Sequence, residues 1–210
     1  MEPPTTQKMG AISAVRELDL ALARRAAGGD RSAQRELFHA QRGPVHHTLF
    51  RILGSNRELE DLIQDSFLEI FRALPSFRGD STLSRWCQTI ATRTAYLSIS
   101  RRKPASIDIA LVQDELAGDA DTRRLAQLRE IARRLYIALD RIEAKQRIAF
   151  ALAVVDGLSL AEVAQLTDST VVAVKTRVWR ARRDLMKRAS RDAVLAQYVD
   201  ELAGREGDEP

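Results

Sequence analysis

The chain has 210 residues, a formal net charge of +4 and one cysteine. One cysteine excludes an intrachain disulfide, and no apolar run approaches the roughly 18 residues that span a bilayer. The N-terminus also lacks the apolar core of a secretory signal peptide. We therefore expect a cytoplasmic protein without membrane insertion. The helical period recurs throughout and strand-like alternation does not persist, which predicts an all-α fold.

The charge is unevenly distributed along the chain. Residues 1–103 carry a net +5 and residues 129–191 a net +7, whereas residues 104–128 carry −3 and residues 192–210 carry −5. Two basic blocks separated by an acidic strip indicate two modules that face nucleic acid, joined by a linker.

The first 103 residues are predicted to begin with a short disordered segment, 1–12, and to continue as one helical domain, 13–103. Helices are expected over 13–27 and 32–53, the second kinked or interrupted at Gly43-Pro44 because proline removes a backbone donor. His46 and His47 are adjacent and point about 100° apart on a helix, so we expect no metal site.

Residues 56–74 form a regular amphipathic pattern, with Asn56 as a candidate cap. Its apolar stripe runs from Leu59 to Leu74, and Glu58, Asp61, Asp65 and Glu69 follow the other side. The residues alone leave two interpretations open, a tolerated acidic surface or a docking face for a basic partner helix. An acid–base catalytic pair is weakly supported, because no histidine or glycine-rich loop lies nearby.

The segment 75–82 is predicted to be a loop, capped by Ser81 or Thr82 at the start of a helix that ends near Arg102. We expect Leu83, Trp86, Cys87, Ile90, Ala91, Thr94 and Leu97 to be buried. Phe77, Arg78, Arg85, Arg93 and Tyr96 offer planar groups for stacking and cations for phosphates, as a single-strand site requires. A packed Phe77 beside a solvated basic face is the alternative.

The second half begins with a flexible acidic linker, 104–122, and continues as a helical domain, 123–189. Helices are expected over 122–139 and onward to Asp156-Gly157. Ser159 and Glu162 then form a capping box, a turn follows at residues 167–169, and Thr170 caps a basic helix. This order predicts a DNA-binding helix-turn-helix, the alternative being an ordinary helical hairpin. Residues 190–210 form an acidic tail.

Two motifs together resemble a known family. The stretch from Glu58 to Ala95, which contains DLIQDSF and FRGDSTLSRW, resembles region 2 of bacterial RNA polymerase sigma factors. Residues 129–188, with DGLSLAEVA and VKTRVWRARRDL, resemble their region 4. The small size and the linker in place of a third domain are similar to the extracytoplasmic-function (ECF) group.

The resemblance implies partners and site residues. Glu58, Asp61, Gln64, Asp65 and Phe67 are implied to dock on the clamp helices of the largest core polymerase subunit, while region 4 contacts the flap. The melted −10 element is implied to bind Phe77, Arg78, Gly79, Asp80, Ser81, Thr82, Arg85, Trp86, Thr89, Arg93 and Tyr96. The duplex −35 element is implied to bind Thr170, Val171, Val172, Lys175, Thr176, Arg177, Trp179, Arg180, Arg182 and Arg183. An anti-sigma factor is a further implied partner, and no cofactor is implied.

Three positions depart from the family pattern. Arg93 and Leu97 stand where Asn and Asp or Asn are frequent, which suggests a different −10 preference. Arg141-Ile142 replaces a usual Leu-Pro, which favours a continuous helix across that point. The turn of the helix-turn-helix lacks its usual glycine near Asp168, although Asp tolerates positive φ better than most residues.

The resulting hypothesis is a sigma factor without catalytic residues of its own, which binds core polymerase and directs promoter recognition, melting and initiation. A free-standing helix-turn-helix regulator, binding DNA as a dimer, is the first alternative. A nucleic-acid enzyme is the second, but it requires a carboxylate cluster with a metal, and the sequence offers none.

Overall fold

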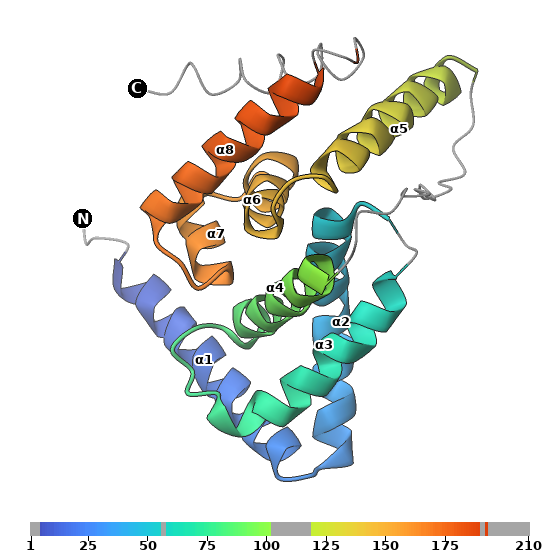
Figure 1. Cartoon of the computed structure of the whole chain (residues 1–210). Helices are drawn as coiled ribbons and strands as arrows, with labels where there is room; N and C mark the ends of the chain where they lie inside the picture. The colour runs from blue at the N-terminus through green and yellow to red at the C-terminus, as the bar shows by residue number, and fades with distance from the viewer. Residues whose placement is uncertain (1–4, 56–57, 102–118, 190–191, 193–210) are drawn as a thin grey trace.

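The computed structural model describes residues 5–55, 58–101, 119–189 and residue 192, and within these ranges it is helical without strands, as predicted (Figure 1). The N-terminal domain contains α1 (Thr5–Ala27), α2 (Arg31–Leu53), α3 (Leu59–Ala73), the 3-10 turn η1 (Leu74–Ser76) and α4 (Leu83–Arg101). The C-terminal domain contains α5 (Asp119–Leu139), α6 (Ala144–Phe150), the π-helical turn η2 (Ala151–Val155), α7 (Leu160–Leu166) and α8 (Val171–Ala189). Helix α4 lies between the domains and packs on both.

Helix α1 begins earlier than the sequence suggested. It starts at Thr5, so the predicted disordered segment is helical from that residue onward. The prolines, at positions 3 and 4, precede the helix and therefore break none of its hydrogen bonds. Its predicted end is confirmed, because α1 stops at Ala27 and Gly29 adopts φ +89°.

Of the kink or interruption expected at Gly43-Pro44, the interruption is wrong, because α2 runs unbroken from Arg31 to Leu53, and the kink stays a prediction. Its side chains are fully buried on both sides of the proline, at Leu37 and at Val45. We infer that tertiary packing on both halves offsets the lost backbone bond. Gly54 ends the helix at φ +71°, and the ring of Tyr136 occupies the place of a Cβ there.

The amphipathic pattern of α3 is confirmed in its core. The helix starts at Leu59, and the proposed cap Asn56 lies outside the described residues. Its buried side chains are Leu59, Leu62, Ile63, Ser66, Phe67 and Ile70. The opposite side carries exposed carboxylates and an exposed Leu68.

Helix α4 buries a stripe that is rotated from the predicted one. Leu83, Cys87 and Ala91 are buried as expected, but Leu97 is 44% exposed and Thr92 is buried. Thr92 lies on the side of α4 that packs against the C-terminal domain, which the helical period cannot reveal. Cys87 is a fully buried core residue, and this burial, together with the nearby carboxylate of Asp19, raises the pKa of its thiol to about 12.

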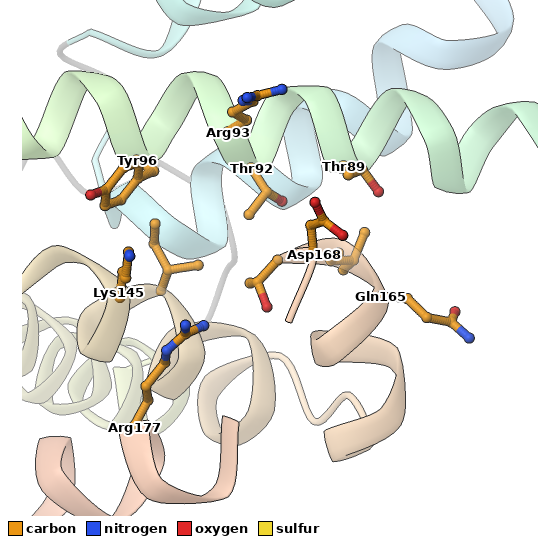
Figure 2. Close-up of a pocket in the computed structure, with 11 residues that line it drawn as sticks. Thr89, Thr92, Arg93, Tyr96, Lys145, Gln165, Asp168 and Arg177 are labelled. Carbon is orange, nitrogen blue, oxygen red and sulfur yellow. The ribbon is translucent and has the colours of Figure 1, made fainter. Parts of the chain in front are cut away.

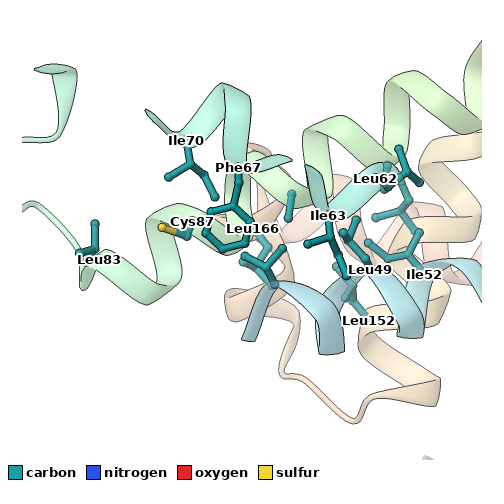
Figure 3. Packing of buried hydrophobic residues seen from close by; sticks show 14 of the residues in the cluster. Leu49, Ile52, Leu62, Ile63, Phe67, Ile70, Leu83, Cys87, Leu152 and Leu166 are labelled. Atoms are coloured by element: carbon teal, nitrogen blue, oxygen red, sulfur yellow. The ribbon is translucent and has the colours of Figure 1, made fainter. Parts of the chain in front are cut away.

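One hydrophobic core spans the two domains. Leu152 from η2 and Leu166 from α7 belong to the same cluster as Leu49, Ile63 and Cys87 of the N-terminal domain. Figure 3 shows both leucines among the side chains of α2, α3 and α4. A second cluster holds the C-terminal domain together, with Leu135, Leu139, Phe150, Ala181 and Leu185.

The expectation of a continuous helix through Arg141-Ile142 is wrong. Helix α5 ends at Leu139 and α6 begins at Ala144. Glu143 starts the new helix without a proline, because its carboxylate accepts from the backbone N–H groups of Lys145 and Gln146 at 3.0 and 3.1 Å. Among the side chains of α5 whose burial the structure describes, Leu135, Ala138 and Leu139 of the apolar stripe are buried and Leu128 is 51% exposed.

The helix-turn-helix forms as the sequence predicts. Ser159 and Glu162 make a reciprocal capping box at the start of α7. The turn places Asp168 at φ +46°, where the family pattern has glycine. The Thr170 hydroxyl accepts from the Ala173 N–H at 3.2 Å and caps α8. Among the described residues, no helix meets the length and hydropathy needed to cross a membrane.

Leu152→Ala tests whether the core is shared. Leu152 is fully buried among both domains, so we expect a loss of about 3 kcal/mol in the free energy of unfolding. That loss corresponds to a fall of about 8 °C in Tm for a chain of this size. The matched control Leu128→Ala removes the same atoms from an exposed site and should stay within about 0.5 kcal/mol. Equal effects of the two substitutions would contradict the shared core.

Candidate nucleic-acid interface

Helix α8 presents a basic outer face to solvent. Val174, Val178, Ala181 and Leu185 face the core and leave the other side open. Val172 is 75% exposed and Trp179 is 58% exposed, with the Arg183 guanidinium 4.9 Å from the Trp179 ring centroid. The predicted −35 residues that share this exposed face are Thr170, Val171, Val172, Lys175, Thr176, Trp179, Arg180 and Arg183. Their cations and apolar groups suit phosphates and thymine methyls in a major groove.

Two of the predicted −35 residues lie apart from that face. Arg177 is half-buried and donates from Nη1 to the Ser169 hydroxyl at 3.2 Å, which ties α8 to the turn before it. Arg182 is also half-buried. Arg177 therefore supports the geometry of the turn in this conformation.

The predicted docking residues of α3 divide into two sets. Asp61, Gln64 and Asp65 are exposed along one side of the helix, and Glu58 is half-buried at its start. The prediction that Phe67 belongs to the docking surface is wrong, because Phe67 is 4% exposed and packs against the rings of Phe38 and Phe71. The helical period itself places position 67 on the apolar stripe, so the resemblance assigned a core residue to the surface.

The prediction that Phe77 contacts the −10 strand is also wrong. Phe77 is 9% exposed and its ring packs 5.3 Å from that of Trp86, so the packed alternative applies. The loop after it is held on α1, where Leu20 fills the space beside Gly79 and Asp19 accepts from the Leu83 N–H at 2.7 Å. This support from Asp19 had no signal in the sequence.

The remaining loop residues lead into α4. Arg78, Asp80 and Thr82 are exposed and Ser81 is half-buried. The Thr82 hydroxyl accepts from the Arg85 N–H at 3.2 Å, which confirms Thr82 as a cap.

The polar face of α4 lies opposite the C-terminal domain (Figure 2). A cavity of about 350 Å³ separates them, with Thr89, Thr92, Arg93 and Tyr96 on one side. The other side consists of Lys145, Ile148, Gln165, Leu166, Thr167, Asp168 and Arg177. Lys145 lies 5.6 Å from the centroid of the Tyr96 ring. Three predicted −10 residues, Thr89, Arg93 and Tyr96, thus line one cavity, where Thr89 and Tyr96 are half-buried and Arg93 stays exposed.

An ion pair crosses the same interface. Arg85 Nη2 lies 3.1 Å from Glu162 Oε1. Hydrogen bonds from the Ser159 hydroxyl and N–H, together with the positive charge of Arg85, lower the pKa of Glu162. Glu162 therefore both caps α7 and holds a predicted −10 residue.

These surfaces carry charged, polar and aromatic side chains on helix faces. Among the described residues, no group of three or more His, Cys, Asp or Glu side chains is placed to hold a metal ion. The two domains offer an exposed basic helix within a helix-turn-helix, a polar helix face with cations and an aromatic ring, and an acidic helix side. This fold and these surfaces define a DNA-binding transcription factor with two modules.

The comparisons with known proteins give the family. The family described as Sigma-70 region 2 matches residues 37–104, and Sigma-70, region 4 matches residues 132–185. The ECF RNA polymerase sigma-E factor of Salmonella typhimurium (strain 14028s / SGSC 2262) is 31% identical over 173 residues, covering 78% of this chain and 90% of that protein. The sigma-E factor of Haemophilus influenzae is also 31% identical, with 78% and 91% covered.

The fold agrees with a solved relative. The structure of CnrH in complex with the cytosolic domain of CnrY has a TM-score of 0.54 and 22% identity, covering 83% of this chain and 98% of that one.

The chain belongs to the ECF group of RNA polymerase sigma factors. It binds core polymerase and directs promoter recognition, DNA melting and transcription initiation.

Glu162→Gln tests the electrostatic part of the capping box. Because the folded pKa of Glu162 is lowered, its contribution to stability is present above the unfolded pKa and is lost as the pH falls through the folded pKa. The wild type should exceed the variant in Tm at about pH 6, and the gap should close towards about pH 3. Thermal unfolding at both pH values measures this, with Glu36→Gln on an exposed stretch of α2 as the control. A gap that persists at the lower pH would show that the carboxylate charge is not responsible.

Proposed function

We propose that the exposed side of α3 is the docking surface for core polymerase. Glu58, Asp61, Gln64 and Asp65 form this acidic surface, which fits a basic partner helix such as the clamp helices of the largest subunit. Three of the four side chains are exposed on a helix whose other side is buried. Phe67 is left out because it packs inside the domain.

The outer face of α8 is proposed to read the −35 element, and this exposed basic face is the observation that carries the assignment. Its N-terminal residues, from Thr170 to Thr176, would contact base edges, and Arg180 and Arg183 would contact phosphates. Arg177 and Arg182 are assigned to the support of this face. The C-terminal domain, residues 123–189, would also contact the polymerase flap.

The −10 strand is proposed to bind the loop 78–82 and the polar face of α4. The cations, hydroxyls and stacking ring of this face come from Arg85, Thr89, Arg93 and Tyr96. The rings of Trp86 and Phe77 pack together and support the loop. The N-terminal domain, 13–103, thereby carries both the docking surface and the −10 site. The expected linker 104–122 is wrong at its end, because residues 119–122 begin α5. Residues 104–118 and 190–210 are proposed as linker and tail, and apart from residue 192 they lie outside the described residues.

The chain is proposed to contribute no catalytic residue and to act in the cytoplasm on promoter DNA. An anti-sigma factor is a further proposed partner. The resemblance of both domains to sigma regions supports it, and CnrH, which shares the fold, was solved with the cytosolic domain of CnrY bound.

Transcription in vitro with core polymerase on a pool of genomic promoters tests the assignment of the acidic surface. The wild type should produce start sites that share two spaced elements. Asp61→Asn with Asp65→Asn should lower initiation at least about tenfold, since two charges leave the docking surface. Glu60→Gln is the matched control, because Glu60 lies on the same helix but pairs with Arg42 at 3.2 Å. DNA binding as a dimer without any effect of core would instead favour a free-standing regulator.

Lys175→Ala tests the reading face of α8. Loss of one exposed cation at a phosphate or base should weaken binding to a duplex with the mapped −35 element about tenfold, and a phosphate contact should also lower the salt slope by about one. Fluorescence anisotropy at several salt concentrations measures both. Met186→Ala is the control, because Met186 is exposed later on α8 and carries no charge. Unchanged affinity for Lys175→Ala would remove this residue from the interface.

A further inference from the structure

The cavity of about 350 Å³ between the domains is lined by three cations. Arg93 belongs to α4, whereas Lys145 and Arg177 belong to α6 and α8 of the other domain. Figure 2 shows the side chains of Lys145 and Arg177 extending from the C-terminal domain towards α4. Asp168 is the acidic residue among the lining side chains. Three cations and one carboxylate leave an excess of two positive charges around this cavity.

The cations of the cavity have no carboxylate partner. In the part of the chain that the structure describes, Arg93, Lys145 and Asp168 take part in no ion pair. The Arg177 guanidinium donates from Nη1 to the hydroxyl of Ser169 at 3.2 Å. An arginine has five N–H donors, so Arg177 keeps donors for a further acceptor.

Other arginines at the domain boundary are paired with oxygen. Arg51 Nε lies 3.1 Å from Asp156 Oδ1. Arg147 is fully buried, pairs with Asp140 and donates to two carbonyls of α2 at 3.2 and 3.1 Å. Such partners compensate for the hydration that a charge loses at an interface. The protein supplies no such compensation for the cations of the cavity, which an anionic ligand would provide.

Buried apolar side chains form part of the cavity wall. Ile148 and Leu166 line it and are 2% and 1% exposed. Charges beside such a surface interact more strongly than charges surrounded by water. The hydroxyls of Thr92 and Thr167 donate to helix carbonyls at 2.8 and 2.7 Å, so their hydrogens are already used. The cations are therefore the groups that would recognise a ligand in this cavity.

We propose that this cavity is a binding site for a small anion that carries one phosphate group, held by Arg93, Lys145 and Arg177. A phosphate oxygen accepts strong, charge-assisted hydrogen bonds from guanidinium and ammonium groups. A phosphate monoester carries a charge of about −1.5 to −2 at pH 7, which matches the excess of two positive charges around the cavity.

The volume of the cavity limits the size of this anion. Pockets that bury small molecules run from about 300 to 1,000 Å³, and a cavity of about 350 Å³ lies at the low end of that range. A mononucleotide or a smaller phosphate ester fits such a volume, whereas a run of stacked nucleotides does not.

Calorimetric titration of the full chain with adenosine 5′-monophosphate (AMP) tests the site. AMP should bind at a single site, and adenosine, which lacks the phosphate, should bind at least about tenfold more weakly. Inorganic phosphate is titrated in parallel. Tighter binding of AMP assigns a phosphate ester to the site, and tighter binding of inorganic phosphate assigns the free anion. Absence of saturable binding by both overturns the proposal, as does equal affinity for AMP and adenosine.

Two substitutions should change the affinity for AMP in opposite directions. Lys145→Ala removes a cation and should weaken binding about tenfold, whereas Asp168→Asn removes the carboxylate charge and should tighten binding about threefold. Both side chains are exposed, so both variants should fold. Asn also tolerates the φ of +46° at position 168, and Lys145→Ala keeps the backbone N–H that donates to Glu143.

Lys175→Ala is the matched control, because it removes an exposed lysine of α8 that does not line the cavity. It should leave the affinity for AMP unchanged. Equal losses in Lys145→Ala and Lys175→Ala would reveal diffuse binding to basic surface and overturn the site. Weaker binding in Asp168→Asn would also contradict it. The titrations contain neither DNA nor polymerase, so their outcome is independent of the transcription experiment that tests the proposed function.

Discussion

The buried guanidinium of Arg147 is the contact on which the arrangement of the two domains depends. A charge without solvent is tolerated only with close partners, and Arg147 finds them on both domains, in Asp140 and in the carbonyls of Ile52 and Leu53. Withdrawing one domain would strand both the cation and the end of α2. The domains therefore meet through directional hydrogen bonds as well as apolar contact, which fixes one orientation among the many that a hydrophobic surface allows.

The two proposed DNA surfaces differ in how much of each is packed against the rest of the protein. Helix α8 buries one narrow stripe and keeps its basic face in solvent, as an isolated helix-turn-helix does. Helix α4 is packed from two directions, so its polar face belongs to an interface in this conformation. The proposed duplex-reading surface is thus open to solvent, whereas part of the proposed strand-binding surface lies against the neighbouring domain.

Local features were predictable from the sequence, and contacts between domains were not. The capping box at Ser159 and the positive φ at Asp168 follow from neighbouring residues. Phe67 and Phe77 were misplaced because a family motif records residue identity without saying whether the side chain contacts a partner or supports the fold. Arg147, Tyr136 and Asp156 gave no signal, since their partners on α2 lie more than 80 positions away along the chain.

Gly54 carries a consequence for how such a chain can change over evolutionary time. Its missing side chain is the space that the Tyr136 ring occupies, with the ring atom Cγ 2.1 Å from where a Cβ would stand. A larger residue at position 54 is acceptable only if position 136 becomes small or the domains separate. The two halves of the protein therefore cannot diversify or be exchanged between relatives independently. A chimera takes position 54 from one parent and position 136 from the other, and a side chain at position 54 would clash with a tyrosine at position 136.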